Sequence, residues 1–172
     1  MPINLFKKKI SQQDAAILLF QTLHDGIRKN ITSDLELLHE YFSLPQNLSS
    51  NEEDLIRYDI FIAALALETQ AIINLSPQDK NVINCLKDYI LKNAGTEVND
   101  YIRSYINIYY SYSKKGENPV SAVAQALYIK IKGRVNSNIK EIDPITTTVI
   151  ESLLVSKSGT WKTIKNNFKI KK

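Results

Sequence analysis

A glutamate and a histidine in the first third of the chain have the spacing of paired metal ligands. Glu36 and His39 lie three residues apart, which places both side chains on one face of a predicted helix. Helical bundles that bind two metal ions need a second such pair, but the other histidine, His24, has Gln21 at the matching position. A single metal ion held by His24, His39 and Glu68 remains an alternative. We expect both histidines to lie at the edges of apolar stripes, so the sequence predicts neither a metal nor a cofactor.

Glu68 is the one charged residue within an otherwise apolar stretch of sequence. Burial of a carboxylate is costly unless it is paired, and Arg57 lies on the same helical face about three turns earlier. The sequence therefore predicts a structural Glu68 paired with Arg57, with a general acid or base as the alternative. Cys85 has no histidine close by in the sequence that could activate it, so we interpret it as a packed thiol. We expect the chain not to be an enzyme.

Residues 158–172 are predicted to form a basic C-terminal helix and tail. Two stripes run along this helix, an apolar one of Trp161, Ile164 and Phe168 and a basic one of Lys162, Lys165 and Lys169. Such a helix can lie on an anionic membrane, contact phosphates or bind a partner protein. Because apolar stripes mostly face a core, we favour packing of this stripe against the domain itself. The candidate partner-binding residues are Trp161, Lys162, Lys165 and Lys169.

The segment before this helix allows a further interpretation, a helix-turn-helix. It would consist of Pro144–Lys157, a turn at residues 158–160 and the C-terminal helix, whose lysines would face phosphates. Sequence-specific readout relies largely on arginine, asparagine and glutamine, and this segment contains no arginine. The pattern therefore gives little support to a sequence-specific DNA-binding protein.

Tyrosines gather on one predicted helix. One face carries Tyr101, Tyr105, Tyr109 and Tyr112, with Tyr110 beside them. Exposed aromatic rings in a basic groove can stack on single-stranded bases, but positive charge is sparse near these rings. We therefore expect the rings to pack half-buried with their hydroxyls at the rim.

The charge of the chain is unevenly distributed. The 172 residues carry a net charge of +4. Residues 34–100 contain 4 basic and 12 acidic side chains, whereas residues 130–172 contain 10 basic and 3 acidic ones. The two regions could attract each other within one fold or recruit different partners, and we favour the attraction within the fold.

Cysteine content and apolar run length bear on location. Cys85 is the one cysteine and cannot form an internal disulfide, which fits a reducing compartment and predicts a cytoplasmic protein. The longest apolar run, residues 60–67, is far shorter than the roughly 20 residues that a membrane span needs. We therefore expect no membrane insertion.

Capping residues, prolines and glycines divide the chain into helices. Helix starts are indicated by Ser76-Pro77, Asn118-Pro119 and Asp143-Pro144, and helix ends by Gly95, Gly116, Gly133 and Gly159. The apolar periodicity predicts one all-α domain over residues 1–172, a bundle of six to eight helices around a central apolar helix at about 51–75. The other helices are expected at about 11–30, 33–44, 77–93, 97–114, 119–132, 144–157 and 161–168, with a loop at 134–142 and a frayed lysine-rich end.

Glycine placement also bears on function. Because the glycines are used at helix ends, no two lie close enough to form a phosphate-binding loop. We expect a non-catalytic interaction or regulatory protein that binds a macromolecular partner, expected to be a protein, through its basic C-terminal face. Nucleic-acid binding by the basic C-terminal helix is the second hypothesis, and a metal- or carboxylate-dependent enzyme is the third.

Overall fold

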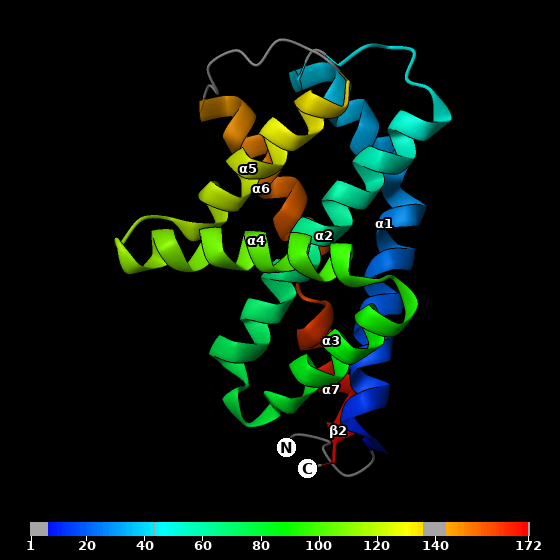
Figure 1. Ribbon diagram of the computed structural model, residues 1–172, viewed down its shortest axis with the longest axis vertical. Helices are drawn as coiled ribbons and strands as arrows, with labels where there is room; N and C mark the ends of the chain where they lie inside the picture. The colour runs from blue at the N-terminus through cyan, green and yellow to red at the C-terminus, as the bar shows by residue number, and fades with distance from the viewer. Residues whose placement is uncertain (1–6, 43, 136–143, 172) are drawn as a thin grey trace, which may run out of the picture.

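Helices form nearly all of the regular structure (Figure 1). The computed structural model describes residues 7–42, 44–135 and 144–171. The helices are α1 (Gln12–Phe42), α2 (Ser50–Leu75), α3 (Asn81–Asn93), α4 (Thr96–Lys114), α5 (Pro119–Arg134), α6 (Pro144–Lys157) and α7 (Thr160–Asn167), with a 3-10 turn η1 (Pro77–Asp79). This architecture confirms the predicted all-α bundle.

Helix α2 is the centre of the bundle, as the sequence predicts for residues 51–75. The hydroxyl of Ser49 accepts the N–H of Glu52 at 3.3 Å, and the Glu52 carboxylate accepts the N–H of Ser49 at 2.8 Å, which fixes the start of the helix. Buried residues occur all round α2 between Ile56 and Ile72, and α1, α4, α5, α6 and α7 pack against it. By length and composition α2 could also cross a membrane, but 72% of its 18-residue apolar window is buried within the fold. Such burial is typical of the central helix of a bundle.

Helix α1 is continuous where the sequence predicts two helices. We expected Ser33 to cap the second one, but its hydroxyl donates to the backbone carbonyl of Asn30 at 2.9 Å, a bond that a serine inside a helix can make. Ile31 and Leu35 extend the buried stripe through the expected break. Core packing thus carries the helix past a sequence that resembles a helix start, and α1 runs along the length of the molecule (Figure 1).

The predicted helix at 77–93 is broken near its start. Residues Pro77–Asp79 form η1, and α3 begins only at Asn81. Ser76 makes no capping hydrogen bond to the following turn, and its hydroxyl accepts the indole N–H of Trp161 at 3.3 Å. A contact with the C-terminal helix therefore replaces the expected cap.

Helix α5 continues through Gly133, which we expected to end it. Its last residue, Arg134, donates two hydrogen bonds of 2.9 and 3.1 Å to the buried carboxylate of Asp59 on α2, which holds the final turn in place. Positive φ angles do occur at three of the four glycines that we expected at helix ends, namely Gly95, Gly116 and Gly159. Most of the loop predicted at 134–142 lies outside the described residues.

The C-terminal end is a strand where the sequence predicts a frayed tail. Strand β2 (Phe168–Ile170) pairs in parallel with β1 (Lys8–Ile10), which precedes α1. Residues 144–157 are helical as predicted, despite their β-branched run. Figure 1 shows β2 beside the start of α1 at one end of the molecule.

Candidate functional site

The parallel pairing of β1 with β2 brings lysines from both ends of the chain together. Lys9 lies directly opposite Lys169, and the N–H of Lys171 extends the ladder by donating to the carbonyl of Ile10 at 2.9 Å. The apolar residues of the sheet pack against the core, and they are Ile10, Phe168 and Ile170. Because side chains alternate between the two faces of a strand, Lys9, Lys169 and Lys171 project from the outer face. Two positively charged side chains that are directly opposed repel each other.

Helix α7 docks on the core through its apolar stripe. Trp161 is 1% exposed and Ile164 is 3% exposed, and α7 packs against α1 and α2. This burial agrees with the packing that we favoured from the sequence. Trp161 therefore positions the helix, and its side chain is buried while α7 is docked.

The side chain of Glu68 holds the first turn of α7. Its carboxylate accepts the backbone N–H groups of Trp161 at 2.9 Å and Thr160 at 3.0 Å, and also that of Gly159. The first N–H groups of a helix have no partner within the helix, and a carboxylate also interacts favourably with the positive end of the helix dipole. Burial raises the pKa of Glu68, and the three hydrogen bonds oppose that rise. Glu68 is thus buried and bonded, as expected of a structural residue.

The prediction that Glu68 pairs with Arg57 is wrong. Arg57 pairs with Asp54 at 2.7 Å near the start of α2. Residues eleven positions apart on a helix are separated by roughly 16 Å, beyond the reach of the two side chains. The actual partners are backbone groups, which carry no signature in residue type.

Helix α7 carries Lys162 and Lys165, and the strand β2 that follows it carries Lys169. Lys162 and Lys169 are exposed, whereas the ammonium group of Lys165 pairs with Asp79 at 2.6 Å. The side chain of Lys7 donates to the backbone carbonyl of Lys165 at 3.0 Å, which joins the start of the chain to the last turn of α7. Three of the four predicted partner-binding residues, the lysines, therefore share one end of the molecule.

We call this surface the basic end. It consists of Lys7, Lys8, Lys9, Lys162, Lys165, Lys169 and Lys171. Among the described residues, Asp79 pairs with Lys165, and Asp14 at the start of α1 interacts electrostatically with Lys171 and Lys8. Hydrogen bonds from Ser11 lower the pKa of Asp14, and the charges of Lys171 and Lys8 lower it further. Seven lysines against two carboxylates give the basic end a net charge of +5, whereas the whole chain carries +4.

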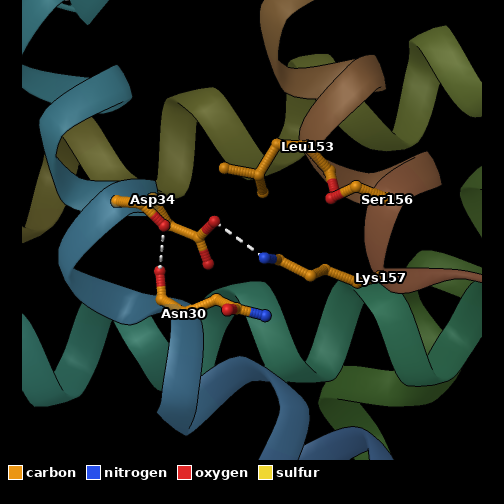
Figure 2. A network of polar contacts seen from close by, with 6 residues as sticks. Asn30, Asp34, Leu153, Ser156 and Lys157 are labelled. Carbon is orange, nitrogen blue, oxygen red and sulfur yellow. Dashed lines mark hydrogen bonds and ion pairs between the residues drawn. The ribbon is translucent and has the colours of Figure 1, made fainter.

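A buried ion pair fixes the helix that leads into α7. Lys157, in the last turn of α6, donates to the Asp34 carboxylate on α1 at 2.7 Å, and both side chains are less than a tenth exposed (Figure 2). The other carboxylate oxygen of Asp34 is buried without a hydrogen-bond partner in the described part of the chain. Figure 2 shows Lys157 reaching from α6 toward α1. The entry to α7 is therefore held by this pair from one side and by Glu68 from another.

The structure does not bring the candidate metal ligands together. His24 and His39 lie fifteen positions apart on α1, a separation of roughly 22 Å. His24 lies 3.5 Å from Asp25, and Nδ1 of His39 lies 3.4 Å from the carbonyl oxygen of Leu44. The carboxylate of Glu68 accepts three backbone N–H groups at the start of α7. Across residues 7–42, 44–135 and 144–171, no three His, Cys, Asp or Glu side chains cluster where they could hold a metal ion.

The tyrosines of α4 are mostly half-buried, as predicted. Tyr105 is buried, which raises the pKa of its hydroxyl, and Tyr110 is 38% exposed. The ammonium group of Lys130 lies 4.2 Å from the centre of the Tyr101 ring, which is a cation–π contact within the fold. Cys85 is a partly buried free thiol that packs against the core, as interpreted from the sequence.

The sequence interpretation missed Lys7, Lys8 and Lys9 as part of the site. The segment 168–171 alternates apolar residues with lysines, as an amphipathic strand does, but residues 7–10 are three lysines followed by Ile10 and do not alternate. Three-residue strands are too short for this alternation to stand out, and only the fold shows that the two segments meet.

Comparison with known proteins found no matching family model, no matching curated protein and no matching solved structure.

Proposed function

We propose that this chain is a non-catalytic binding protein whose basic end binds an anionic macromolecular partner. The observation that carries the proposal is the parallel pairing of β1 with β2, which places Lys9 opposite Lys169. Lysine on a short edge strand also discourages pairing with other chains, but a directly opposed pair of lysines is not needed for that effect. A bound anion would relieve the repulsion between these two side chains.

The distribution of charge supports the same function. The basic end has a net charge of +5 in a chain of net charge +4, so the remainder of the chain is close to neutral. A one-sided distribution orients a protein as it approaches an oppositely charged partner and accelerates the encounter. The acidic middle of the chain neutralises only one of the seven lysines by a direct ion pair in the described residues, that between Asp79 and Lys165.

The burial of Trp161 supports a site in which lysines make the contacts. Trp161 and Ile164 are committed to the core, so α7 offers ammonium groups to a partner and no large apolar side chain. Lys162 and Lys169 are exposed. The binding is therefore driven by charge, and we expect it to weaken steeply as salt is added.

The proposal is tested with heparin, a soluble polyanion. We expect the protein to bind heparin in solution at low salt, and the double variant Lys9→Gln/Lys169→Gln to bind it more weakly. The matched control is Lys29→Gln/Lys114→Gln, which removes the same charge from two exposed lysines outside the basic end. Equal binding by the two double variants would show that net charge alone is responsible and would refute the proposed site.

A further inference from the structure

We propose that the anion bound by the basic end is the phosphate backbone of a nucleic-acid duplex, contacted without reading of the base sequence. This inference rests on the proposed function and names the class of partner. It follows from the kinds of side chain that lie beside the lysines of the basic end, and from the aromatic rings and the first turn of α7, which are held inside the fold.

The basic end lacks the apolar side chains that a protein partner or a membrane would use. Protein interfaces are anchored by aromatic and other large side chains and are depleted in lysine, and membrane-surface helices insert an apolar face. The large apolar residues exposed in the described part of the chain are Leu37, Tyr41, Leu75, Tyr110, Ile129, Ile145 and Val155. None of them belongs to β1, α7 or β2. Phosphate contacts, in contrast, need only cations and hydrogen-bond donors.

The aromatic rings near these lysines are not available for stacking. Proteins that bind single strands stack bases on exposed aromatic side chains. Trp161 is 1% exposed, and Phe168 is partly buried against the core. A duplex keeps its bases stacked on each other and presents its phosphates outward, so it suits a surface of lysines without exposed rings.

The first turn of α7 is committed to the fold through its backbone N–H groups and through the burial of Trp161. A recognition helix reads bases with residues near its N-terminus. In this protein that end is bonded to Glu68 through the N–H groups of Trp161, Thr160 and Gly159. The opposite end of α7 carries Asn166 and Asn167, both exposed. Their amides add neutral donors for phosphate oxygens beside the lysines.

The test compares binding of the full chain to five probes by fluorescence anisotropy and co-sedimentation. These probes are mixed-sequence duplexes of DNA and of RNA, a mixed-sequence single strand, polyglutamate, and vesicles of anionic phospholipid. We expect tight binding to a duplex that is independent of its sequence and weakens as salt rises. In Lys9→Gln/Lys169→Gln the slope of log affinity against log salt becomes shallower by about 2 units, because two phosphate contacts are lost. The control Lys29→Gln/Lys114→Gln keeps the original slope.

The outcomes separate this inference from the proposed function. Binding to the DNA or the RNA duplex with the expected change of slope supports both, and the two duplexes show which nucleic acid is preferred. Preference for polyglutamate, vesicles or the single strand, lost in Lys9→Gln/Lys169→Gln, would overturn the duplex inference and leave the proposed function in place. Binding to none of these probes at low salt would overturn both.

Discussion

The side-chain carboxylate of Glu68 accepts the backbone N–H of Trp161 at a distance of 2.9 Å, which ties the middle of α2 to the first turn of α7. Both residues are almost completely buried. The same carboxylate accepts two further N–H groups at the start of α7. Because β2 follows α7 directly, the contact also sets the position of the strand that carries Lys169.

Loss of the Glu68 carboxylate should destabilise the protein. In Glu68→Ala the buried N–H of Trp161 and its two neighbours lose their acceptor, and we expect the free energy of unfolding to fall by roughly 3–5 kcal/mol. Glu68→Gln keeps the shape and one acceptor oxygen, so its loss should be smaller. Chemical denaturation followed by Trp161 emission measures both changes. Wild-type stability in Glu68→Ala would show that the carboxylate contributes nothing to the docking of α7.

Glu68 should also give the stability of the protein a characteristic pH dependence. Its pKa is raised by burial in the folded state, so the folded protein binds a proton more readily than the unfolded chain does. The contribution of Glu68 to the free energy of unfolding is complete below the pKa that Glu68 has in the unfolded chain. It is lost as the pH rises through the higher pKa that Glu68 has in the folded protein. In Glu68→Gln that decline should be missing from the curve of unfolding free energy against pH. Identical curves for wild type and Glu68→Gln would contradict the raised pKa.

The buried pair of Asp34 and Lys157 should respond differently to single and double replacement. Asp34→Leu leaves a buried ammonium group without a partner, and we expect a loss of roughly 3–5 kcal/mol. The double variant Asp34→Leu/Lys157→Met removes both charges and should be more stable than Asp34→Leu. Thermal and denaturant unfolding of the two variants measure the difference. A double variant less stable than Asp34→Leu would contradict the expectation that an unpaired, buried ammonium group at Lys157 destabilises the fold.

The predictions from sequence succeeded where a pattern is long and local. The central helix at 51–75 follows from apolar residues that run almost all round a predicted helix, and it is buried all round in the structure. The apolar stripe of Trp161 and Ile164 was also interpreted correctly as core, because helical spacing is visible over a few residues. The central helix and the apolar stripe can both be recognised from residues that are close together in the sequence.

The predictions failed where a contact joins distant parts of the chain. Ser33 resembles a helix cap, and only the packing of α1 shows that it is not one. Glu68 bonds to backbone groups more than ninety positions away, so a search among charged side chains pointed to Arg57. The lysines of β1 became part of the site only through their pairing with β2.

In the proposed function, pairing of the two strands, and not lysine content as such, creates the binding surface. A variant that breaks the sheet without changing charge tests it. In a β-strand the N–H and C=O of one residue point to the same side, and the carbonyl of Ile10 faces β2, so Ile10→Pro removes a donor of the ladder. Ile10→Val is the matched control that keeps the N–H, and the helical circular-dichroism signal confirms that both variants are folded.

The decisive measurement is the affinity of Ile10→Pro and Ile10→Val for a nucleic-acid duplex over a range of salt concentrations. We expect Ile10→Pro to bind more weakly and with a shallower salt slope than Ile10→Val, although the two proteins have the same net charge. Equal affinities and equal slopes would contradict the claim that the paired strands form the site.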